Sequence, residues 1–473
     1  EPRSPADVEH PGTVQRAEAL DVGSRIRGQF PVEAVRIRLL DEERPEEVQG
    51  APPRGPKLPG QRHGGHPATL PQRDGCTRES RSTYREPVHI VVLNWRDTAN
   101  PEGGGSEVYV EQLARRWARH GHRVTLVCAA HDRAPALEER DGIRFIRVGT
   151  KLTVYSRARK LLRRGALGTV DVVVDTQNGI PFFARYATSA PTVVLVHHVH
   201  REQWPVVYDP VRARVGWFIE SVAAPRALLG SAYVAVSEAT RSELVAQGVP
   251  AQAITVVHNG TEALPASGAA RDSAPRILVL GRLVPHKRVE HVIAAAARLR
   301  AHHPGLSVAV VGDGWWAPHL HEAARAHGVA DIVEFTGHVS EAEKARQVDR
   351  AWVLALPSLK EGWGLVVMEA ASRGVPTIAY ADAGGVAESV VDDVTGVLVD
   401  GEEPEFVAAL DALLTDDSRR TAMGERARER SAQFSWDASA LSFEQVLVSA
   451  MGATTSRPST TGSRRRRRRA YRP

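Results

Sequence analysis

The stretch "VHIVVLNWRDTANPEGGGSEVYVEQLARRWARHGHRVTLVCA", residues 88–129, decides the fold of this chain. An apolar run opens it, a glycine loop follows, and a helical pattern then places Val110, Leu113 and Trp117 on one face. Gly121 ends this pattern before a second apolar run begins. The order strand, glycine loop, helix, strand predicts parallel pairing of the two strands in a buried sheet.

The same alternation recurs along most of the chain. Further strands of the first half are predicted at 170–175, 192–198, 233–237 and 254–260. The composition of "TEALPASGAARDSAP" (261–275) is typical of a linker, after which the pattern restarts. Strands of the second half are predicted at 276–281, 306–314, 332–337, 352–358, 377–385 and 396–400, with a final helix over roughly 404–450. Two doubly wound halves place ligands in the cleft between the carboxyl ends of both sheets.

We therefore predict an α/β chain of two Rossmann-like domains that face a cleft. The first covers 86–268, the second 269–435, and a helix at 436–452 packs back on the first domain. Residues 1–85 are rich in Pro, Gly and Arg and have almost no apolar periodicity, which predicts a disordered extension. The Arg-rich segment 453–473 is predicted to be a disordered tail.

Composition restricts the class of protein. Hydrophobic residues make up 42% of the 473 residues, enough for sizeable cores, and the net charge of +5 suits an anionic ligand or membrane surface. No apolar run reaches the ~18 residues of a membrane-spanning helix, and the start lacks the order of a signal peptide. Cys76 lies in the predicted extension and Cys128 in a predicted strand, which favours a reducing cytoplasm over a disulfide framework. A nucleic-acid partner is not expected.

Two acids stand out in "EGWGLVVME" (361–369). Glu361 lies on a glycine loop, where Gly362 and Gly364 permit a tight turn, and Glu369 falls in the first turns of a predicted helix. An acid near a helix N-terminus is electrostatically favourable and can accept hydrogen bonds from a ribose diol, while Glu361 is free to contact a sugar. Taken singly, each acid is equally compatible with a capping or surface carboxylate.

Two loops carry complementary chemistry. "GRLVPHK" (281–287) presents Arg282 and Lys287 at the end of a strand, where two cations would neutralise a pyrophosphate and assist its departure. "GGGSE" (103–107) lies between a strand and a helix, so its backbone N–H groups suit a phosphate or a sugar, although a simple tight turn fits as well.

Together these motifs resemble a retaining GT-B glycosyltransferase of family 4, the "glycosyl transferases group 1" kind. Glu361 and Glu369 match its pair of acids separated by seven residues, and Arg282 with Lys287 matches its phosphate-clamping loop. The resemblance covers about residues 86–450. Further matches are "VSE" (236–238), "VVHNG" (256–260) and "GHVS" (337–340).

The resemblance implies roles for these residues. Glu369 would bind the nucleotide ribose, and Glu361 the hydroxyls of the donor sugar. Arg282 and Lys287 would hold the diphosphate. A histidine of "HHVH" would contact the donor sugar, and we favour His198 over His197. The other residues implied are Gly281, His338, Gly362, Gly364 and Leu365 on the donor side, and Gly104, Gly105, Ser106 and His197 on the acceptor side.

The resemblance also implies an activity. A hexose would pass with retention from GDP-mannose or a UDP-hexose to an acceptor hydroxyl of a glycan or lipid-linked glycan. No Asp-x-Asp motif stands at a plausible site, so no metal or other cofactor is expected beside the donor substrate. The alternatives are a nucleotide-sugar epimerase or hydrolase on the same fold, and a non-catalytic nucleotide-sugar-binding protein.

A basic amphipathic stretch, "KLTVYSRARKLLRRGAL" (151–167), bears on the acceptor. Val154, Ala158, Leu161 and Leu162 are predicted to form an apolar face with arginines and a lysine around it. This segment and the six arginines at 464–469 predict peripheral contact with an anionic membrane by a cytoplasmic enzyme. The alternatives are an ordinary surface helix and a solvated tail.

Overall fold

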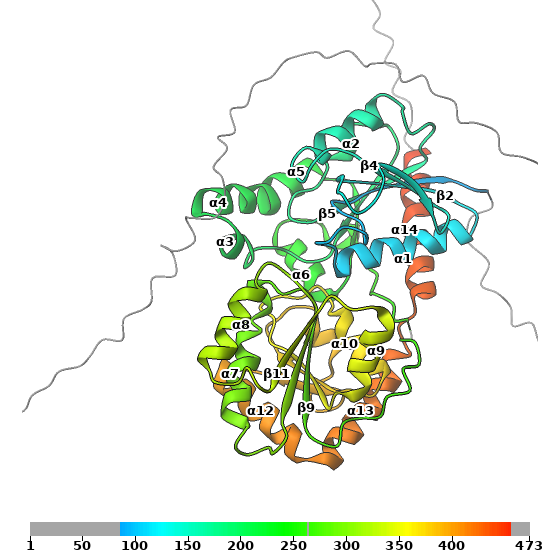
Figure 1. Cartoon of the computed structure of the whole chain (residues 1–473). Coiled ribbons are helices and arrows are strands. Elements are labelled where there is room, and N and C mark those ends of the chain that lie inside the picture. Colours follow the sequence, from blue (N-terminus) through cyan, green and yellow to red (C-terminus); the bar gives the residue numbers. More distant parts are fainter. Residues whose placement is uncertain (1–85, 263, 456–473) are drawn as a thin grey trace, which may run out of the picture. The chain divides into compact units, whose positions relative to one another are not determined.

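The computed structural model describes residues 86–262 and 264–455 (Figure 1). The predicted extension 1–85, with Cys76, and residues 456–473 of the predicted tail lie outside the described residues. The prediction that the tail begins at residue 453 is wrong, because 453–455 belong to the last helix described. The described chain is α/β with two separate sheets, as predicted. We call the eight-stranded sheet with its helices the first lobe, and the six-stranded sheet with its helices the second lobe.

The sheet of the first lobe has the strand order β3-β4-β2-β1-β5-β6-β7-β8. In its centre, Ile90 pairs with Val124 on one side and with Val172 on the other, both in parallel register. Its strands are β1 (His89–Leu93), β2 (Arg123–Cys128), β3 (Leu137–Arg140), β4 (Ile143–Arg147), β5 (Val172–Gln177), β6 (Thr192–Val196), β7 (Ala232–Ala235) and β8 (Ile254–Val256). Its helices include α1 (Gly105–Arg119), α2 (Val154–Arg163), α3 (Trp204–Val207), α4 (Pro210–Phe218), α5 (Ala224–Ala227) and α6 (Glu238–Ala246).

The hairpin β3–β4 does not follow from the apolar runs, because β3 is short and mostly exposed. It is the antiparallel pair in this sheet. Asp141 and Gly142 form its turn with φ angles of 55° and 77°, the left-handed conformation that an Asp-Gly hairpin turn requires. This dipeptide is the signal in the sequence that locates the hairpin.

The sheet of the second lobe has the order β11-β10-β9-β12-β13-β14, and every pair is parallel. Its strands are β9 (Arg276–Leu280), β10 (Ser307–Val311), β11 (Val333–Gly337), β12 (Val353–Leu356), β13 (Thr377–Tyr380) and β14 (Gly396–Val399). Its helices are α7 (Glu290–Leu299), α8 (Ala317–Ala326), α9 (Glu341–Arg350), α10 (Leu365–Ser372), α11 (Val386–Ser389), α12 (Glu403–Thr415) and α13 (Asp417–Ser431). The runs β9, β12 and β13 are fully buried, which is why they read as continuous apolar stretches.

The single final helix predicted over 404–450 is wrong, because the chain breaks there into α12, α13 and α14 (Trp436–Thr455). Asp416 leaves the helical conformation, with ψ of 92°, and its side chain accepts a hydrogen bond from the backbone N–H of Arg419. It therefore ends α12 and caps α13 at once.

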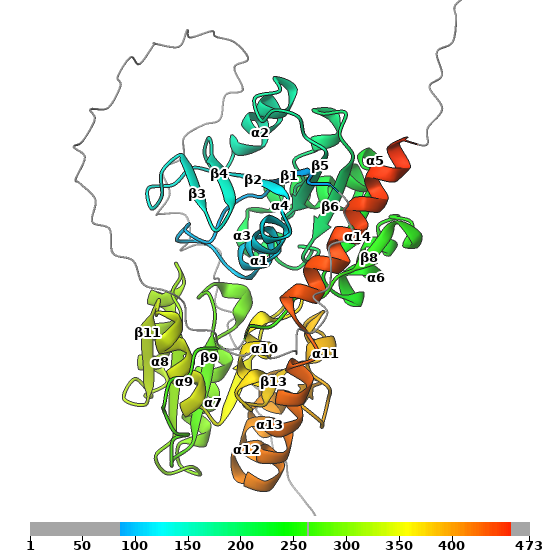
Figure 2. The ribbon, with the colours of Figure 1, turned by 90° about the vertical axis from the view of Figure 1, so that its right-hand side faces the viewer.

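Helix α14 returns to the first lobe and packs across α1 (Figure 2). The indole N–H of Trp117 donates to the carbonyl of Ala440 at 3.2 Å, and its ring packs against Phe443 with centroids 5.3 Å apart. Arg116 and Asp437 form an ion pair at 2.5 Å. The last described helix thus covers one face of the first sheet.

The helix predicted within 151–167 is α2, but its apolar side chains point inward. Val154 and Ala158 are fully buried, Leu162 is nearly so, and all three belong to one core cluster with Phe182. The prediction that this face lies on a membrane is therefore wrong, because the protein's own core covers it. The basic side chains remain on the outer side; they are Arg157, Lys160, Arg163 and Arg164.

Candidate active site

The loop between β12 and α10 carries Glu361. Its backbone is fixed by the segment after β13: Glu361 N–H donates to the carbonyl of Ala383 at 2.9 Å, and Gly385 N–H donates to the carbonyl of Glu361 at 3.1 Å. Gly364 then begins α10 with φ of 85°, a conformation that a side chain would strain. The loop is therefore a rigid platform on which the acid is presented.

Glu361 meets Lys287 in a buried ion pair. Lys287 ends the 3₁₀ turn Pro285–Lys287 after β9, and its ammonium contacts Oε1 of Glu361, which also accepts a hydrogen bond from Ser358 at 2.7 Å. Burial alone would raise the pKa of Glu361, but the charge and hydrogen bond of Lys287 hold it below its usual range. The structure thus brings together two residues that the sequence placed in different loops.

Glu369 lies on α10 and pairs with a residue that sequence reasoning missed. Lys344 of α9 donates to its Oε1 at 2.7 Å. Burial raises the pKa of Glu369, and Lys344 opposes that rise without cancelling it. Lys344 stands among the acidic residues at the start of α9, and its partner lies 25 residues further along the chain. Nothing in the sequence around Lys344 therefore indicates that it belongs to the site.

Arg282 lies against the glycine loop of the first lobe. Its guanidinium donates to the carbonyl of Glu102 at 3.1 Å, and a Cβ placed on Gly104 would lie 2.9 Å from its Nε. Gly105 faces Leu365 in the same way, with 3.3 Å between a built Cβ and the leucine Cδ1. Burial, and then the neighbouring charge of Arg96, lower the pKa of Arg282. Glycine is needed here because the two lobes approach each other so closely.

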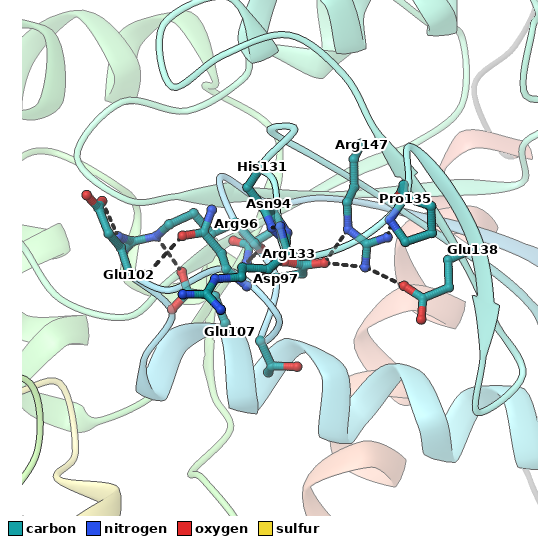
Figure 3. Close-up of polar contacts among 12 residues, drawn as sticks. Asn94, Arg96, Asp97, Glu102, Glu107, His131, Arg133, Pro135, Glu138 and Arg147 are labelled. Atoms are coloured by element: carbon teal, nitrogen blue, oxygen red, sulfur yellow. Dashed lines mark hydrogen bonds and ion pairs between the residues drawn. The ribbon is translucent and has the colours of Figure 1, made fainter. Parts of the chain in front are cut away.

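Glu107 binds the glycine loop from within helix α1, and Figure 3 shows it near Arg96. Its Oε2 accepts from the backbone N–H of Gly104 at 2.7 Å and from the Ser106 hydroxyl at 2.9 Å. Its Oε1 lies 3.4 Å from Nε of Arg96. Burial alone would raise the pKa of Glu107, but Arg96 and then Arg282 lower it, so the fully buried acid is ionised. The predicted site residue Ser106 therefore already has a partner inside its own loop.

A second buried network anchors the same loop to β4 (Figure 3). Arg147 donates to Asp97 at 2.7 Å and to Glu138 at 2.7 Å, and His131 lies 2.9 Å from the other oxygen of Asp97. Asp97 also accepts from the backbone N–H of Asn100 at 3.1 Å. Sequence analysis identified none of these residues, because Asp97 and Arg147 are 50 positions apart and stand in no recognisable motif.

The two candidate histidines follow β6. A Cβ on Gly362 would collide with the carbonyl oxygen of His197, so the backbones of the two lobes are in close contact here. The ring of His197 packs edge-on against Tyr109 at 5.2 Å, and its Nε2 has no hydrogen-bond partner in the part of the chain that the structure describes. Burial lowers the pKa of His197 to about 4, so the ring is neutral at neutral pH.

His198 is neutral as well, because burial and then the nearby His200 lower its pKa well below the usual value. Its Nε2 lies 3.2 Å from the amide oxygen of Gln203, and its ring lies 4.2 Å from that of His200. His200 is in turn held by Glu220, whose carboxylate is 3.0 Å from its Nδ1. Glu220 also accepts from the indole of Trp204 at 2.6 Å, so one buried acid organises this side of the site.

His286 belongs to the loop 281–287 but was not predicted as a site residue. Burial and then the charge of Lys287 lower its pKa to about 4, with Glu361, Arg282 and His200 also acting on it. Its pKa is therefore influenced by charged groups of both lobes. Its Nδ1 is buried, and no residue of the described ranges bonds to it.

The remaining predicted residues lie at or near the same strand ends. Gly281 follows β9 with φ of 142°, and its carbonyl faces Gly312 so closely that a Cβ there would collide with it. His338 is exposed directly after β11, which β10 separates from β9. A small cavity lies at the ends of β9 and β12; it is lined by, among others, Gly281, Arg282, Lys287, Pro357 and Ser358.

Two charged contacts link the lobes beside this site. The carboxylate of Glu388 accepts from the backbone N–H groups of Glu238 and Ala239, at 2.9 and 2.8 Å, at the N-terminus of α6. Lys360, next to Glu361 in the sequence, forms an ion pair with Glu243 of the same helix. Helix α6 thus contacts one carboxylate and one ammonium group of the second lobe.

Metal-binding and membrane-spanning features were also sought. Across residues 86–262 and 264–455, no group of three or more His, Cys, Asp or Glu side chains is arranged to hold a metal ion. None of the helices described is both long and apolar enough to cross a bilayer.

Comparison with known proteins identifies the family. Residues 103–263 match the family described as Glycosyltransferase Family 4, and residues 261–430 match Glycosyl transferases group 1. A D-inositol 3-phosphate glycosyltransferase of Kribbella flavida is 30% identical over 75% of this chain and 92% of its own length. A GDP-mannose-dependent alpha-(1-6)-phosphatidylinositol monomannoside mannosyltransferase of Mycobacterium tuberculosis (strain H37Rv) is 29% identical over 73% and 95%.

A glycogen synthase of the same Mycobacterium strain is 34% identical over 42% of this chain, and that match spans 49% of the synthase, about half its length. Among solved structures, the sucrose-phosphate synthase of Thermosynechococcus elongatus superposes with a TM-score of 0.67 at 22% identity, covering 77% of this chain and all of that one. Anabaena HepE, solved with UDP and glucose, gives 0.59 at 19%, covering 76% of this chain and all of its own. The chain therefore belongs to the group 1, family 4 glycosyltransferases, and its two lobes are those of the GT-B fold.

Proposed function

We propose that this chain transfers a hexose, with retention, from a nucleotide-diphosphate sugar to a hydroxyl of a glycan or lipid-linked glycan. The observation that carries the proposal is the buried pair Glu361–Lys287. Arg282 lies in the same loop as Lys287, and Glu369 lies on α10, the helix that follows the loop of Glu361. Acids that can bind sugar hydroxyls and cations that can bind phosphates, gathered after the carboxyl ends of β9 and β12, suit a sugar diphosphate.

Arg282 and Lys287 are proposed to bind the diphosphate. As the anomeric bond breaks, negative charge grows on the departing phosphate oxygen, and fixed cations in a buried site lower the free energy of that state. The acceptor oxygen then bonds to the anomeric carbon from the same face, and a phosphate oxygen takes its proton. This route needs no protein nucleophile and no metal.

The two acids have separate proposed tasks. Glu369 would accept hydrogen bonds from the ribose diol, and Glu361 from hydroxyls of the donor sugar. Lys287 keeps Glu361 ionised and is proposed to contact the diphosphate as well. His198, neutral and held by Gln203, is proposed to contact the sugar from the first lobe, with Gly104, Gly105 and Ser106 on the acceptor side.

The names of the relatives support two candidate donor sugars and a lipid-linked acceptor. The mycobacterial relative is named for GDP-mannose and a phosphatidylinositol mannoside, and the Kribbella relative for D-inositol 3-phosphate. Anabaena HepE has also been solved in complex with UDP-glucose. We therefore propose GDP-mannose or a UDP-hexose as donor, and a lipid-linked acceptor used by a cytoplasmic enzyme at the inner face of a membrane.

Thermal shift followed by transfer assays tests the proposal. GDP-mannose and UDP-glucose are compared with GMP and UMP, each with and without EDTA. The true donor should raise the melting temperature, and the stabilisation should grow with the logarithm of the ratio of its concentration to its Kd. Glu361→Gln should retain the fold and lose transfer. Donor turnover without any acceptor would instead indicate a hydrolase or epimerase, and binding without turnover a binding protein.

A further inference from the structure

Helices α3 and α4 present an apolar ridge that nothing in the described chain covers. We define the ridge as Val206, Val207, Tyr208, Val211, Val215 and Phe218. Val211 is 69% exposed, Val215 54% and Phe218 58%, and all three share one face of α4 because they are spaced four and three residues apart. Figure 1 shows α3 and α4 at the outer left edge of the first lobe.

Helix α4 buries its small residues and exposes its large apolar side chains. Its buried residues are the small Ala213 and Gly216, and Gly216 packs so closely on the ring of Trp204 that a Cβ there would overlap it. A surface helix normally buries its large apolar side chains and exposes its polar ones. Here the large apolar side chains point outward, so the sequence of α4 serves an external partner and not the core.

The charges around the ridge select the partner. Arg201, Arg212 and Arg214 are exposed beside it. The acid within the ridge segment, Asp209, caps α4 through the backbone N–H groups of Val211 and Arg212, both at 3.1 Å, and its other carboxylate oxygen lies 3.4 Å from Nε of Arg212, so it offsets part of this charge. A second copy of the chain would bring these arginines against one another, and the arginine run 464–469 would be repelled. An apolar strip with a cationic border matches an anionic lipid surface.

We propose that the ridge inserts into the headgroup region of an anionic bilayer and is the membrane-docking surface of this chain. The segment leading into the ridge also carries Gln203, which contacts His198, and Trp204, which binds Glu220 beside His200. Docking would therefore hold the histidine side of the site next to the bilayer. Delivery of a lipid-linked acceptor there rests on the proposed function, whereas docking itself does not.

Co-sedimentation of the full chain with vesicles tests the docking. Vesicles of phosphatidylglycerol and phosphatidylcholine should bind it, pure phosphatidylcholine should bind it weakly, and added salt should reduce binding. The triple variant Val211→Ser, Val215→Ser, Phe218→Ser should bind at least about tenfold more weakly, because three apolar side chains no longer enter the lipid. Arg212→Gln with Arg214→Gln should reduce the preference for anionic vesicles.

Leu137→Ser is the matched control, since Leu137 is 63% exposed but stands alone on β3. It should bind like the unaltered chain. Equal binding by the triple variant would overturn the proposal, as would binding that appears only after residues 1–85 are removed, or a ridge-dependent dimer in solution. Transfer to a short-chain, water-soluble acceptor should be unchanged in the triple variant, so a failed transfer reaction and a failed docking surface give different results.

Discussion

At the scale of single residues, the pair Glu361–Lys287 sets the charge of the site. Lys287→Met leaves Glu361 buried without a cation, which should lower the free energy of unfolding by about 3 kcal/mol at neutral pH and reduce transfer at least about 100-fold. The double variant Lys287→Met, Glu361→Gln should recover the stability but not the activity. Denaturant melts and initial rates measure both; unchanged activity in the single variant would contradict the assigned role.

The same pair gives a prediction about pH. In the unaltered chain the pKa of Glu361 is lowered, so its contribution to stability is present above the unfolded pKa and is lost as pH falls through the folded one. In Lys287→Met, burial raises that pKa instead, and the variant should become relatively more stable on acidification. Thermal melts between pH 4 and 8 compare the two profiles; parallel profiles would show that Lys287 does not control the acid.

Glu369 should make donor binding pH-dependent. Its pKa is raised, so acidification protonates it and removes the acceptor for a ribose diol, and the affinity for a nucleotide sugar should weaken as pH falls. Lys344→Met removes the opposing cation and should move this transition to higher pH. Titration calorimetry from pH 5 to 8 measures the shift, with Lys160→Met on α2 as the control. A transition at the same pH in both variants would exclude Glu369 from the ribose site.

At the scale of elements, Arg288 connects the loops that carry the two charges. It has φ of 48°, donates to the carbonyls of Pro357 and Ser358 at 2.8 and 3.2 Å, and lies over the ring of Tyr380. Arg288→Gly suits this left-handed backbone but removes the clamp, so the melting temperature should change little while kcat falls about tenfold. Arg288→Lys keeps the positive charge but loses the guanidinium that reaches both carbonyls, so its kcat should fall by a similar factor. Full activity in both would mean that the clamp does not position Glu361.

The elements differ in how far the sequence predicts them. Fully buried parallel strands such as β9 and β12 are predictable because their apolar runs are continuous. The break at Asp416 contains neither Gly nor Pro, so the helical pattern runs across it, although its capping acid is a usable signal. The acids and cations of the site belong to short local motifs. Lys344 and the network of Asp97 escape sequence analysis, because their partners are fixed only by the tertiary fold.

At the scale of the whole molecule, α6 connects the lobes through Glu388 and Lys360. Glu388→Gln with Lys360→Met removes both charged contacts, and amide hydrogen exchange at Glu238 and Ala239 should accelerate at least about tenfold. Amides of β1 should exchange as before, since their sheet is intact. Unchanged exchange at α6 would show that the remaining apolar contacts alone hold the lobes together.

The return of α14 to α1 has a consequence for biosynthesis. Trp117 and Tyr109 are in place early in the chain, but their partners Phe443 and Trp436 emerge more than three hundred residues later. The second lobe, contiguous in sequence, is able to finish folding on the ribosome first. The first lobe must wait with an uncovered aromatic face until α14 is released, and during that interval it is a natural client for a chaperone.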